Sequence, residues 1–421
     1  PRSTLFPYTT LFRSILNSVG AFIYSIIHIL RFFDIYFFIY PNPFGHQTLN
    51  VEYFARKVKL ISKTKNPILV AFRNYEKKYT IANNSLFNHH KSSGLKIINN
   101  RIICLLLDIG LTFQKQQIEK KGGKISTSFL TLTIAQLDTD PDVHLLSDVA
   151  FPFNKHEIDK FKSILDIMSL ESEKYYIVLD RGENYNLSKS IYSGYEFQSY
   201  AYKNQHSPVR LQFKAAMKMK KYNIQAVTMG MGHGLEKETL DSELILDYPS
   251  KFRDSIGDIA DLALMNGCKF YVGPASGVYA FAKSLKKPLF LCNAFPWPWS
   301  LVSMGNTSIV MPKKLWLIKE KRMMTLLEMI KLEQNYSMKD FYYNRSVLGS
   351  MSIELILNTE DEIAGGVKEI NDRIDKKWNG DNYSLSRILK GYIGGVSQSY
   401  LSTYFAENNP DIMNGIRSDE H

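Results

Sequence analysis

The residues best suited to chemistry are the small and hydroxyl-bearing ones of Gly273-Pro274-Ala275-Ser276-Gly277. An apolar run before them predicts a buried strand over Lys269–Val272, and the apolar spacing after them predicts a helix over Ser276–Leu285. Small residues let a ligand approach the backbone, and a helix start offers unpaired N–H groups and a positive dipole end. We therefore predict diphosphate binding here, although an ordinary strand-to-helix turn uses the same residue types.

Two histidines lie in turns that contain glycine. Gly45-His46 follows a predicted strand, and His46 can act as a general base on an acceptor hydroxyl because the pKa of histidine lies near working pH. His233 is flanked by Gly232 and Gly234 and can contact a nucleotide or an acceptor. A structural loop histidine is the alternative interpretation of each.

Cationic and aromatic side chains provide further candidates. Arg181 follows a buried strand, and its guanidinium can hold a phosphate or an acceptor carboxylate, or form a surface salt bridge. Lys313 can offset charge that develops on a leaving diphosphate, or can simply be solvated. Trp297 and Trp299 can stack on a sugar or base, or pack.

Neither a metal site nor a disulfide is predicted. Asp138-Thr139-Asp140 has a D-x-D pattern of carboxylates that can hold a divalent cation, but it lies beside the predicted linker and is interpreted as a solvated turn. Cys104, Cys268 and Cys292 lie in or beside apolar runs with no C-x-x-C pair, which is typical of buried free thiols.

The elements that must position these residues are clearest in the second half of the chain, where apolar runs alternate with helical patterns. This alternation is typical of parallel β-α-β units and predicts an open doubly wound sheet. The predicted strands are Tyr175–Leu179, Ile224–Thr228, Leu244–Leu246, Lys269–Val272 and Leu289–Cys292. The predicted helices begin at Asn154, Ser207, Ser255 and Ser276, with Gly267 as a left-handed stop for the third.

The first half has a weaker pattern. Strands are predicted at Ile35–Tyr40, Ile68–Phe72, Leu95–Ile98 and Ile102–Leu106, a helix at Leu49–Leu60 and a loop at Asn83–Ser93. Residues 1–14 resemble a translated sequencing adapter and are set aside. Ile15–Phe33 is predicted as an apolar helix on a membrane or on the protein, because His28, Arg31 and Asp34 disfavour a true span of the bilayer.

The length and net charge of the chain limit the number of domains and the classes of partner. The 421 residues fit two domains, and a net charge of +11 favours an anionic partner, although no groove-like run indicates nucleic acid. The predicted domains are the adapter-like segment 1–14, the apolar helix 15–34, a first α/β domain 35–150, a second α/β domain 151–375 and a helical tail 376–421.

Several segments, in order, resemble a family of bacterial glycosyltransferases from surface-polysaccharide gene clusters, and the Gly273–Asn293 stretch resembles bacterial heptosyltransferases. The segments are Asn42-Pro43-Phe44-Gly45-His46, Glu52, Val178–Arg181, Tyr202-Lys203-Asn204, Met229-Gly230, Asp247-Tyr248, Asn293 and Met311-Pro312-Lys313. Two departures are Met231, where the family has an acidic residue, and Leu179-Asp180-Arg181-Gly182, where it has His-x-Arg-Asp.

The resemblance implies a GT-B-like α/β fold, in which two Rossmann-like doubly wound domains face each other across a cleft. It implies that residues 35–150 form the acceptor domain and residues 151–375 the nucleotide-sugar-binding domain. It implies a metal-independent, cofactor-free glycosyltransferase that moves a sugar from a nucleotide-sugar donor to a glycan or lipid-linked acceptor. Donor contacts would come from Gly230, His233, Asp247, Gly273, Ser276, Gly277, Asn293 and Lys313. Acceptor or phosphate contacts would come from Gly45, Arg181, Lys203 and Asn204, with His46 as the catalytic base.

The expected location is cytoplasmic, at the inner face of the cytoplasmic membrane, with peripheral membrane contact and no nucleic acid partner. Two rival hypotheses follow from the departures and from the fold. One is a catalytically silent binding or assembly protein on the same scaffold, and the other is a sugar-nucleotide epimerase. The donor sugar, the acceptor and the stereochemical course are open at this point.

Overall fold

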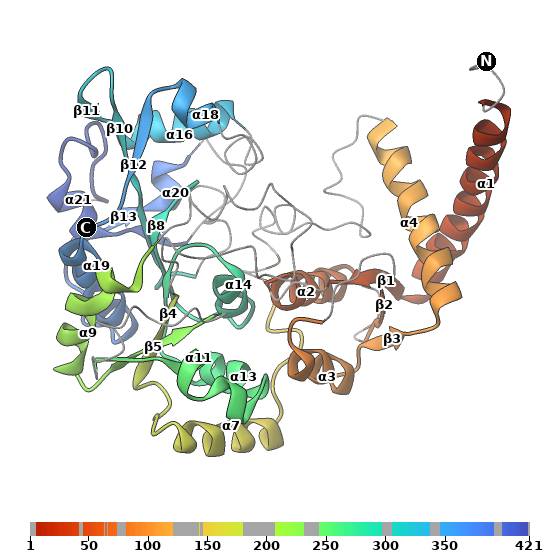
Figure 1. The fold of residues 1–421 in the computed structure, drawn as a ribbon, viewed down its shortest axis with the longest axis horizontal. Helices are drawn as coiled ribbons and strands as arrows, with labels where there is room; N and C mark the ends of the chain where they lie inside the picture. The colour runs from red at the N-terminus through yellow and green to blue at the C-terminus, as the bar shows by residue number, and fades with distance from the viewer. Residues whose placement is uncertain are drawn as a thin grey trace. The chain divides into compact units, whose positions relative to one another are not determined.

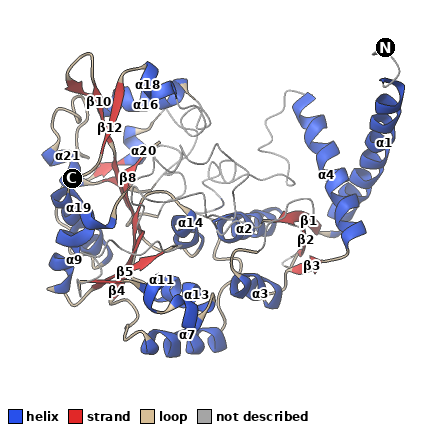
Figure 2. Ribbon diagram, viewed as in Figure 1, coloured by secondary structure: helices blue, strands red, loops and turns tan. Residues whose placement is uncertain are grey.

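The computed structural model describes residues 6–41, 45–62, 64, 66–73, 81–120, 143, 146–179, 207–230, 244–296, 305–336, 346–390 and 398–419. For residues 6–13, 46, 73, 114–116, 118–120 and 346 only the backbone is described. The chain forms two compact units, residues 1–137 with 146–152 and residues 138–145 with 153–421. Each unit is described by itself (Figures 1 and 2).

The first unit is built on a parallel sheet in the order β1-β2-β3. Its strands are β1 (Ile35–Tyr40), β2 (Ile68–Arg73) and β3 (Lys96–Ile98). Its helices are α1 (Phe6–Leu30), α2 (Val51–Ile61), α3 (Asn84–Ser92) and α4 (Arg101–Lys120). A π-helical turn, His46–Asn50, leads into α2.

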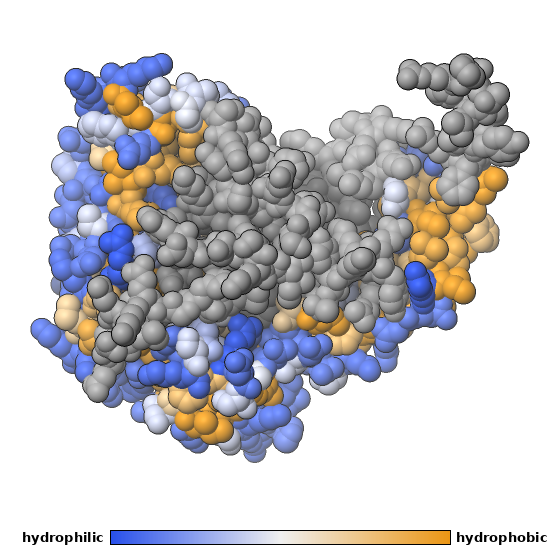
Figure 3. All heavy atoms as spheres, viewed as in Figure 1, coloured by the Kyte–Doolittle hydropathy of each residue, from blue (hydrophilic) through white to orange (hydrophobic). Residues whose placement is uncertain are grey.

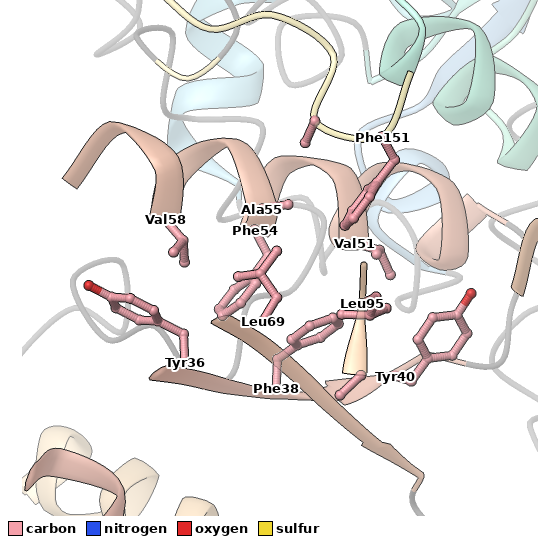
Figure 4. Packing of buried hydrophobic residues seen from close by; sticks show 12 residues of the cluster. Tyr36, Phe38, Tyr40, Val51, Phe54, Ala55, Val58, Leu69, Leu95 and Phe151 are labelled. Atoms are coloured by element: carbon pink, nitrogen blue, oxygen red, sulfur yellow. The ribbon is translucent and has the colours of Figure 1, made fainter. Parts of the chain in front are cut away.

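Side chains alternate along β1 and so divide the core of this unit into two layers. Tyr36, Phe38 and Tyr40 pack in one cluster with residues of α2, among them Phe54 (Figure 4). Phe37 points to the other face, in a second cluster that includes residues of α1 and α4. The sheet is therefore covered by helices on both faces.

Two predictions for this unit are wrong. The run Ile102–Leu106 is not a strand but the start of α4, because Cys104, Leu107 and Leu111 meet the core at helical spacing. Asn83–Ser93 is not a loop, because the Asn83 side chain accepts a hydrogen bond from the Leu86 N–H and caps α3. Helix α1 starts at Phe6, inside the adapter-like segment 1–14.

The second unit contains an eight-stranded sheet in the order β13-β14-β9-β8-β7-β4-β5-β6, in which only the β13–β14 pair is antiparallel. Its strands are β4 (Tyr175–Leu179), β5 (Gln225–Met229), β6 (Ile245–Leu246), β7 (Tyr271–Gly273), β8 (Leu289–Ala294), β9 (Ile309–Pro312), β13 (Tyr383–Ser384) and β14 (Tyr400–Leu401). A small antiparallel sheet contains β10 (Lys314–Leu317), β11 (Arg322–Met323) and β12 (Ile353–Ile356).

The helices of this unit are α7 (Lys155–Ile167), α9 (Phe213–Lys220), α11 (Tyr248–Lys251), α12 (Arg253–Ile256), α13 (Ile259–Gly267), α14 (Gly277–Ser284), α16 (Leu326–Asn335), α18 (Ser346–Ser350), α19 (Glu360–Ile374), α20 (Leu385–Ile388) and α21 (Thr403–Asn408). Figure 1 shows α9 and α19 on one side of the large sheet and α13 and α14 on the other. This doubly wound α/β arrangement confirms the predicted fold class.

Details at three helix ends differ from the predictions. Gly267 is not a left-handed stop but the last residue of α13, where an added Cβ would lie 2.6 Å from Tyr175 Oη. Gly257, with φ 83°, separates α12 from α13, so Ser255 does not start the helix that buries Ala260. Pro208, not Ser207, precedes the helical turn Val209–Gln212 that leads into α9.

Residues 376–421 were predicted as a helical tail, but they also contribute two strands of the large sheet. Strand β14 runs parallel to β9, with Tyr400 opposite Ile309, and β13 pairs with β14. Strands β13 and β14 are too short and too polar to be predicted from their residue pattern. Their pairing in the sheet with the distant strand β9 determines the structure of this segment.

Candidate functional site

The order of the parallel strands locates the candidate site. In β6-β5-β4-β7-β8-β9 the chain winds outward from the centre in both directions, so the connections leave β4 and β7 on opposite faces of the sheet. In open α/β sheets, ligands bind beyond the carboxyl ends of the strands at such a switch point. The carboxyl ends here are Leu179 of β4 and Gly273 of β7.

Glycines bring three strand ends together at this edge. A Cβ added to Gly273 would lie 3.1 Å from Leu179 Cβ, and one added to Gly230, just after β5, would lie 3.1 Å from Leu179 Cδ1. Both glycines have positive φ, 150° and 136°, which L side chains rarely adopt. The predicted Met229-Gly230 and Gly273 turns therefore flank the same strand end.

The turn after β7 is fixed by side-chain hydrogen bonds. Ser276 is the N-cap of α14, and its Oγ accepts a hydrogen bond from the Tyr279 N–H at 3.0 Å. Tyr271 Oη donates to the Pro274 carbonyl at 2.7 Å and lies 3.3 Å from Ser276 Oγ. The turn from Pro274 to Ser276 is thus held rigidly at the carboxyl edge of the sheet.

This turn presents backbone donors to a partly exposed surface. Ala275, Ser276 and Gly277 are neither buried nor fully exposed. Within the described part of the chain, the N–H groups of Ser276, Gly277 and Val278 have no hydrogen-bond acceptor. Free N–H groups at the positive end of a helix dipole form a site for a phosphate or carboxylate.

A partly buried ion pair, which no sequence pattern indicated, supports the neighbouring turn. Arg253 Nη1 donates to the Gly230 carbonyl at 2.8 Å, and its Nη2 lies 3.3 Å from Asp261 Oδ2. Tyr248 Oη donates to Asp261 Oδ1 at 2.8 Å, and burial raises the pKa of Tyr248 above its ordinary value. Arg253 therefore anchors the turn at Gly230 to α13.

Asp247 lies at the end of β6 and is buried. Its Oδ1 accepts a hydrogen bond from Thr228 Oγ1 of β5 at 3.3 Å. Its Oδ2 has no hydrogen-bond partner among the described residues. A buried carboxylate oxygen of this kind can accept hydrogen bonds from a ligand hydroxyl or amine.

Asn293 and Lys313, both predicted to bind the donor, are buried. Asn293 and Asn358 exchange hydrogen bonds, each backbone N–H donating to the other's Oδ1 at 2.6 and 2.7 Å. Asn293 Nδ2 also donates to Ser207 Oγ at 3.0 Å. The Asn293 amide is therefore occupied in joining β8 to the chain around Asn358.

The cysteines are free and buried, as predicted. Burial raises the pKa of Cys292 to about 12, against the smaller opposing effect of the nearby Lys313 ammonium. Gln212 Nε2 lies 3.8 Å from Cys292 Sγ. The Cys292 thiol is thus protonated at physiological pH.

Several predicted site residues lie outside the residues that the structure describes. These are Asp138, Thr139, Asp140, Arg181, Lys203, Asn204, His233, Trp297 and Trp299, together with the side chain of His46. Among the residues that the structure describes, no group of three His, Cys, Asp or Glu side chains is arranged to hold a metal ion. A pocket of about 280 Å³ lies near Lys174 and Gln225, at the opposite, amino-terminal edge of the sheet, away from the switch point.

In the first unit, the predicted acceptor loop leads into a π-helical turn. Gly45 is the buried N-cap residue of this turn, and its carbonyl accepts a hydrogen bond from Thr48 Oγ1 at 2.9 Å. Gln47 Oε1 accepts one from the Asn83 N–H at 3.2 Å. Single π-helical turns are often found at functional sites, which fits the predicted place of Gly45-His46 at the carboxyl end of β1.

Glu52 and His90, near this turn, have structural contacts that the sequence did not indicate. Glu52 forms a buried ion pair with Arg56 at 2.8 Å and accepts hydrogen bonds from the N–H groups of Ala150 and Phe151. His90 Nδ1 lies 3.0 Å from Tyr40 Oη. Burial, with a smaller contribution from His89, lowers the pKa of His90 to about 3, so this ring is neutral at physiological pH.

No protein-family model matches the chain, and no curated protein matches its sequence. Among solved structures it is similar to the glycosyl transferase family 9 protein from Veillonella parvula DSM 2008, at 12% identity and a TM-score of 0.42, over 81% of this chain and 97% of that one. It is also similar to E. coli ADP-heptose lps heptosyltransferase II, at 13% identity and a TM-score of 0.36, over 82% and 99%. With TM-scores below 0.5, the functional assignment depends on the chain's own residues.

Proposed function

We propose that the chain is a glycosyltransferase that binds a nucleotide sugar through the turn Pro274–Val278. The observation that carries this proposal is the set of three N–H groups, of Ser276, Gly277 and Val278, that have no acceptor among the described residues and lie at the switch point of a doubly wound sheet. A diphosphate fits this arrangement, because it presents several acceptor oxygens and two negative charges to the positive end of α14.

In the proposed reaction an acceptor hydroxyl attacks the anomeric carbon of the donor sugar, and the bond to the nucleoside diphosphate breaks. The oxygen of the leaving diphosphate takes the electron pair, and the free N–H groups of the turn after Gly273 stabilise that charge. His46 would accept the proton of the acceptor hydroxyl, and Lys313 and Arg181 would add positive charge. We further propose that no metal is required and that the acceptor is a glycan or a lipid-linked glycan.

Nucleotide binding tests the donor site first. We expect UDP, ADP, GDP or CDP to raise the melting temperature of the full chain, and the sugar nucleotide of the preferred base to bind with similar affinity. Ser276→Ala removes both the helix cap and a phosphate contact, so we expect its affinity for the preferred nucleotide to fall about tenfold.

The matched control is Thr325→Ala, because Thr325 caps α16 in the same way, through its capping box with Glu328. Each cap is worth about 1 kcal/mol, so both variants should lose similar stability, but only Ser276→Ala should lose nucleotide affinity. The donor site would be refuted if no nucleotide stabilised the wild type, or if both variants bound equally well.

Product analysis then separates the activities. Transfer of the sugar to an added glycan or lipid-linked acceptor supports the glycosyltransferase, whereas an isomerised sugar nucleotide indicates an epimerase. Binding with neither product across a broad acceptor panel indicates a silent binding protein. Undiminished transfer by His46→Ala would exclude His46 as the catalytic base.

A further inference from the structure

The first unit presents apolar side chains to solvent on two neighbouring helices, α1 and α4. Of the nineteen exposed large apolar side chains in the described residues, eleven lie on α1, on the turn after it, and on the start of α4. They are Ile15, Leu16, Phe22, Ile26, Ile29, Phe32, Phe33, Ile102, Ile103, Leu105 and Leu106. Figure 3 shows hydrophobic residues gathered over the part of the molecule where Figure 1 places these helices.

These exposed residues lie on faces of the helices that do not pack against the sheet. Helix α1 meets the core through Ile27, and α4 meets it through Cys104, Leu107 and Leu111. The opposite face of α1 has Phe22, Ile26 and Ile29 at helical spacing, and Phe22 is 68% exposed. Each helix is therefore apolar on two sides, and only one side is covered by the protein.

The charge of the chain is concentrated in the same unit. Residues 1–137 contain 18 Lys and Arg against 5 Asp and Glu, whereas residues 138–421 contain 34 against 36. Without the first 14 residues the surplus persists, at 16 against 5. Exposed Arg101 is the first residue of α4, directly before the exposed Ile102 and Ile103, and so places positive charge at the border of the apolar face.

We propose that this face of α1 and α4, with the turn Arg31–Phe33, docks onto the surface of an anionic lipid bilayer. Exposed Phe, Ile and Leu side chains would enter the boundary between headgroups and acyl chains, while the surplus of Lys and Arg is attracted to anionic headgroups. This surface belongs to the first unit, and lipid binding by it does not depend on the donor site in the second unit.

The charge pattern distinguishes a bilayer from other occupants. A second copy docked through the same face would bring two strongly positive units together, which is repulsive. A nucleic acid would match the charge but would leave the exposed Ile and Leu side chains in water. An anionic bilayer would bury the apolar side chains and would also attract the positive charge.

The helix lies on the bilayer rather than crossing it. Ser14–Phe33 is long and apolar enough to span a membrane by length and composition. However, Ile27 of α1 is only 1% exposed and packs in one cluster with Phe37 of β1 and Leu107 of α4. A span would remove α1 from this cluster and expose the sheet, so the covered face of α1 favours a peripheral position.

Vesicle co-sedimentation of the full chain tests the proposal. We expect binding to vesicles of phosphatidylcholine with about 30% phosphatidylglycerol, much weaker binding to pure phosphatidylcholine, and weakening when salt rises from about 0.1 M to about 0.5 M. The triple variant Phe22→Gln, Phe33→Gln and Ile102→Gln should lower the partition coefficient at least about tenfold.

The matched control replaces three exposed apolar residues of the second unit, as Ile167→Gln, Met217→Gln and Ile318→Gln. It should bind vesicles as the wild type does. Circular dichroism confirms that both variants are folded, and nucleotide-induced stabilisation should be the same in both, which separates this surface from the donor site.

Three results would overturn the proposal. The first is equal vesicle binding by the triple variant and the wild type, or no binding by either. The second is a wild-type dimer that the triple variant converts to monomer without any vesicle binding, which would assign the face to a second copy. The third is resistance of the bound wild type to alkaline carbonate extraction, which would indicate a spanning helix.

Discussion

Gly273 is the residue on which the geometry of the proposed diphosphate site depends most directly. Its φ is 150°, and an added Cβ would lie 2.8 Å from Tyr271 Oη, the group that holds the Pro274 carbonyl. We expect Gly273→Ala to lower the free energy of unfolding by about 1–3 kcal/mol and to weaken nucleotide binding, because both the backbone and Tyr271 must move. Urea denaturation and calorimetric titration measure the two effects.

The control for this change is Gly349→Ala. Nothing lies within 4 Å of a Cβ added to Gly349, and its φ is not positive. Gly349 also lies in helix α18, where alanine is favoured. A loss of nucleotide affinity in Gly349→Ala equal to that in Gly273→Ala would contradict the local explanation.

His90 should make the first unit sensitive to acid. Burial lowers the pKa of His90 to about 3, whereas in the unfolded chain it takes up a proton near its ordinary pKa of about 6.5. The unfolded state therefore binds more protons between these values, and acidification from pH 7.5 to pH 5.5 should cost about 1.4 kcal/mol through this residue.

The measurement compares urea unfolding of the wild type and His90→Gln at both pH values. Glutamine keeps an acceptor for Tyr40 Oη but does not titrate. The wild type should lose more stability on acidification than the variant does. An equal loss in both proteins would show that His90 does not carry the effect.

At the scale of single residues, local chemistry made part of the candidate site predictable. Gly273 and Ser276 were identified from the turn itself, since glycine and a capping serine act on their own neighbours. The donor contact of Asn293 stays a prediction, whereas the hydrogen bonds that it exchanges with Asn358, 65 residues away in the chain, were not predicted. A pair of residues this far apart in the chain cannot be predicted from local residue spacing.

At the scale of elements, the packing of α19 against β8 gives a further prediction. A Cβ added to Gly366 of α19 would lie 2.3 Å from Phe290 Cζ of β8. Helix propensity alone would make Gly366→Ala stabilising by about 1 kcal/mol. We expect the opposite, a loss of about 1–3 kcal/mol, because the methyl group must push the helix away from the sheet.

A double-mutant cycle with Phe290→Leu checks this explanation. Leucine lacks the ring atom nearest to Gly366, so the cost of Gly366→Ala should shrink in the Phe290→Leu background. Chemical denaturation of the four proteins measures the coupling. Additive effects would mean that the two residues do not compete for the same space.

Helices and strands were predictable where the apolar pattern of a segment and its length indicated the same type of element. The strands at Ile35–Tyr40 and Tyr175–Leu179 were found because short runs of β-branched and aromatic residues are buried on both faces. The run Ile102–Leu106 was assigned wrongly because five consecutive apolar residues fit a strand or a buried helix equally well. Only the packing of Cys104 and Leu107 against the sheet distinguishes the two.

At the scale of the whole molecule, the doubly wound order was predictable because alternating strands and helices admit few topologies. The place of the last forty-six residues was not. Glu369 in α19 accepts hydrogen bonds from Ser402 Oγ at 2.8 Å and from the Thr403 N–H at 2.9 Å. These bonds, together with the pairing of β14 with β9, make the C-terminal segment part of the second unit.

A shortened chain that ends at residue 397 tests this integration. It would lose β14, so the edge of β9 at Ile309 and Val310 would be exposed and Glu369 would lose three of its partners. We expect the shortened chain to aggregate or to lose cooperative unfolding, measured by size-exclusion chromatography and urea denaturation.

Because a large truncation can fail for other reasons, Ser402→Ala provides the finer test. It removes one hydrogen bond to a buried carboxylate and the cap of α21, and should cost about 1–3 kcal/mol. Ser386→Ala, which changes an exposed serine in the same segment, should cost far less. A soluble, cooperatively folded short chain that still binds nucleotide would show that the C-terminal segment is an addition to the sheet and not part of it.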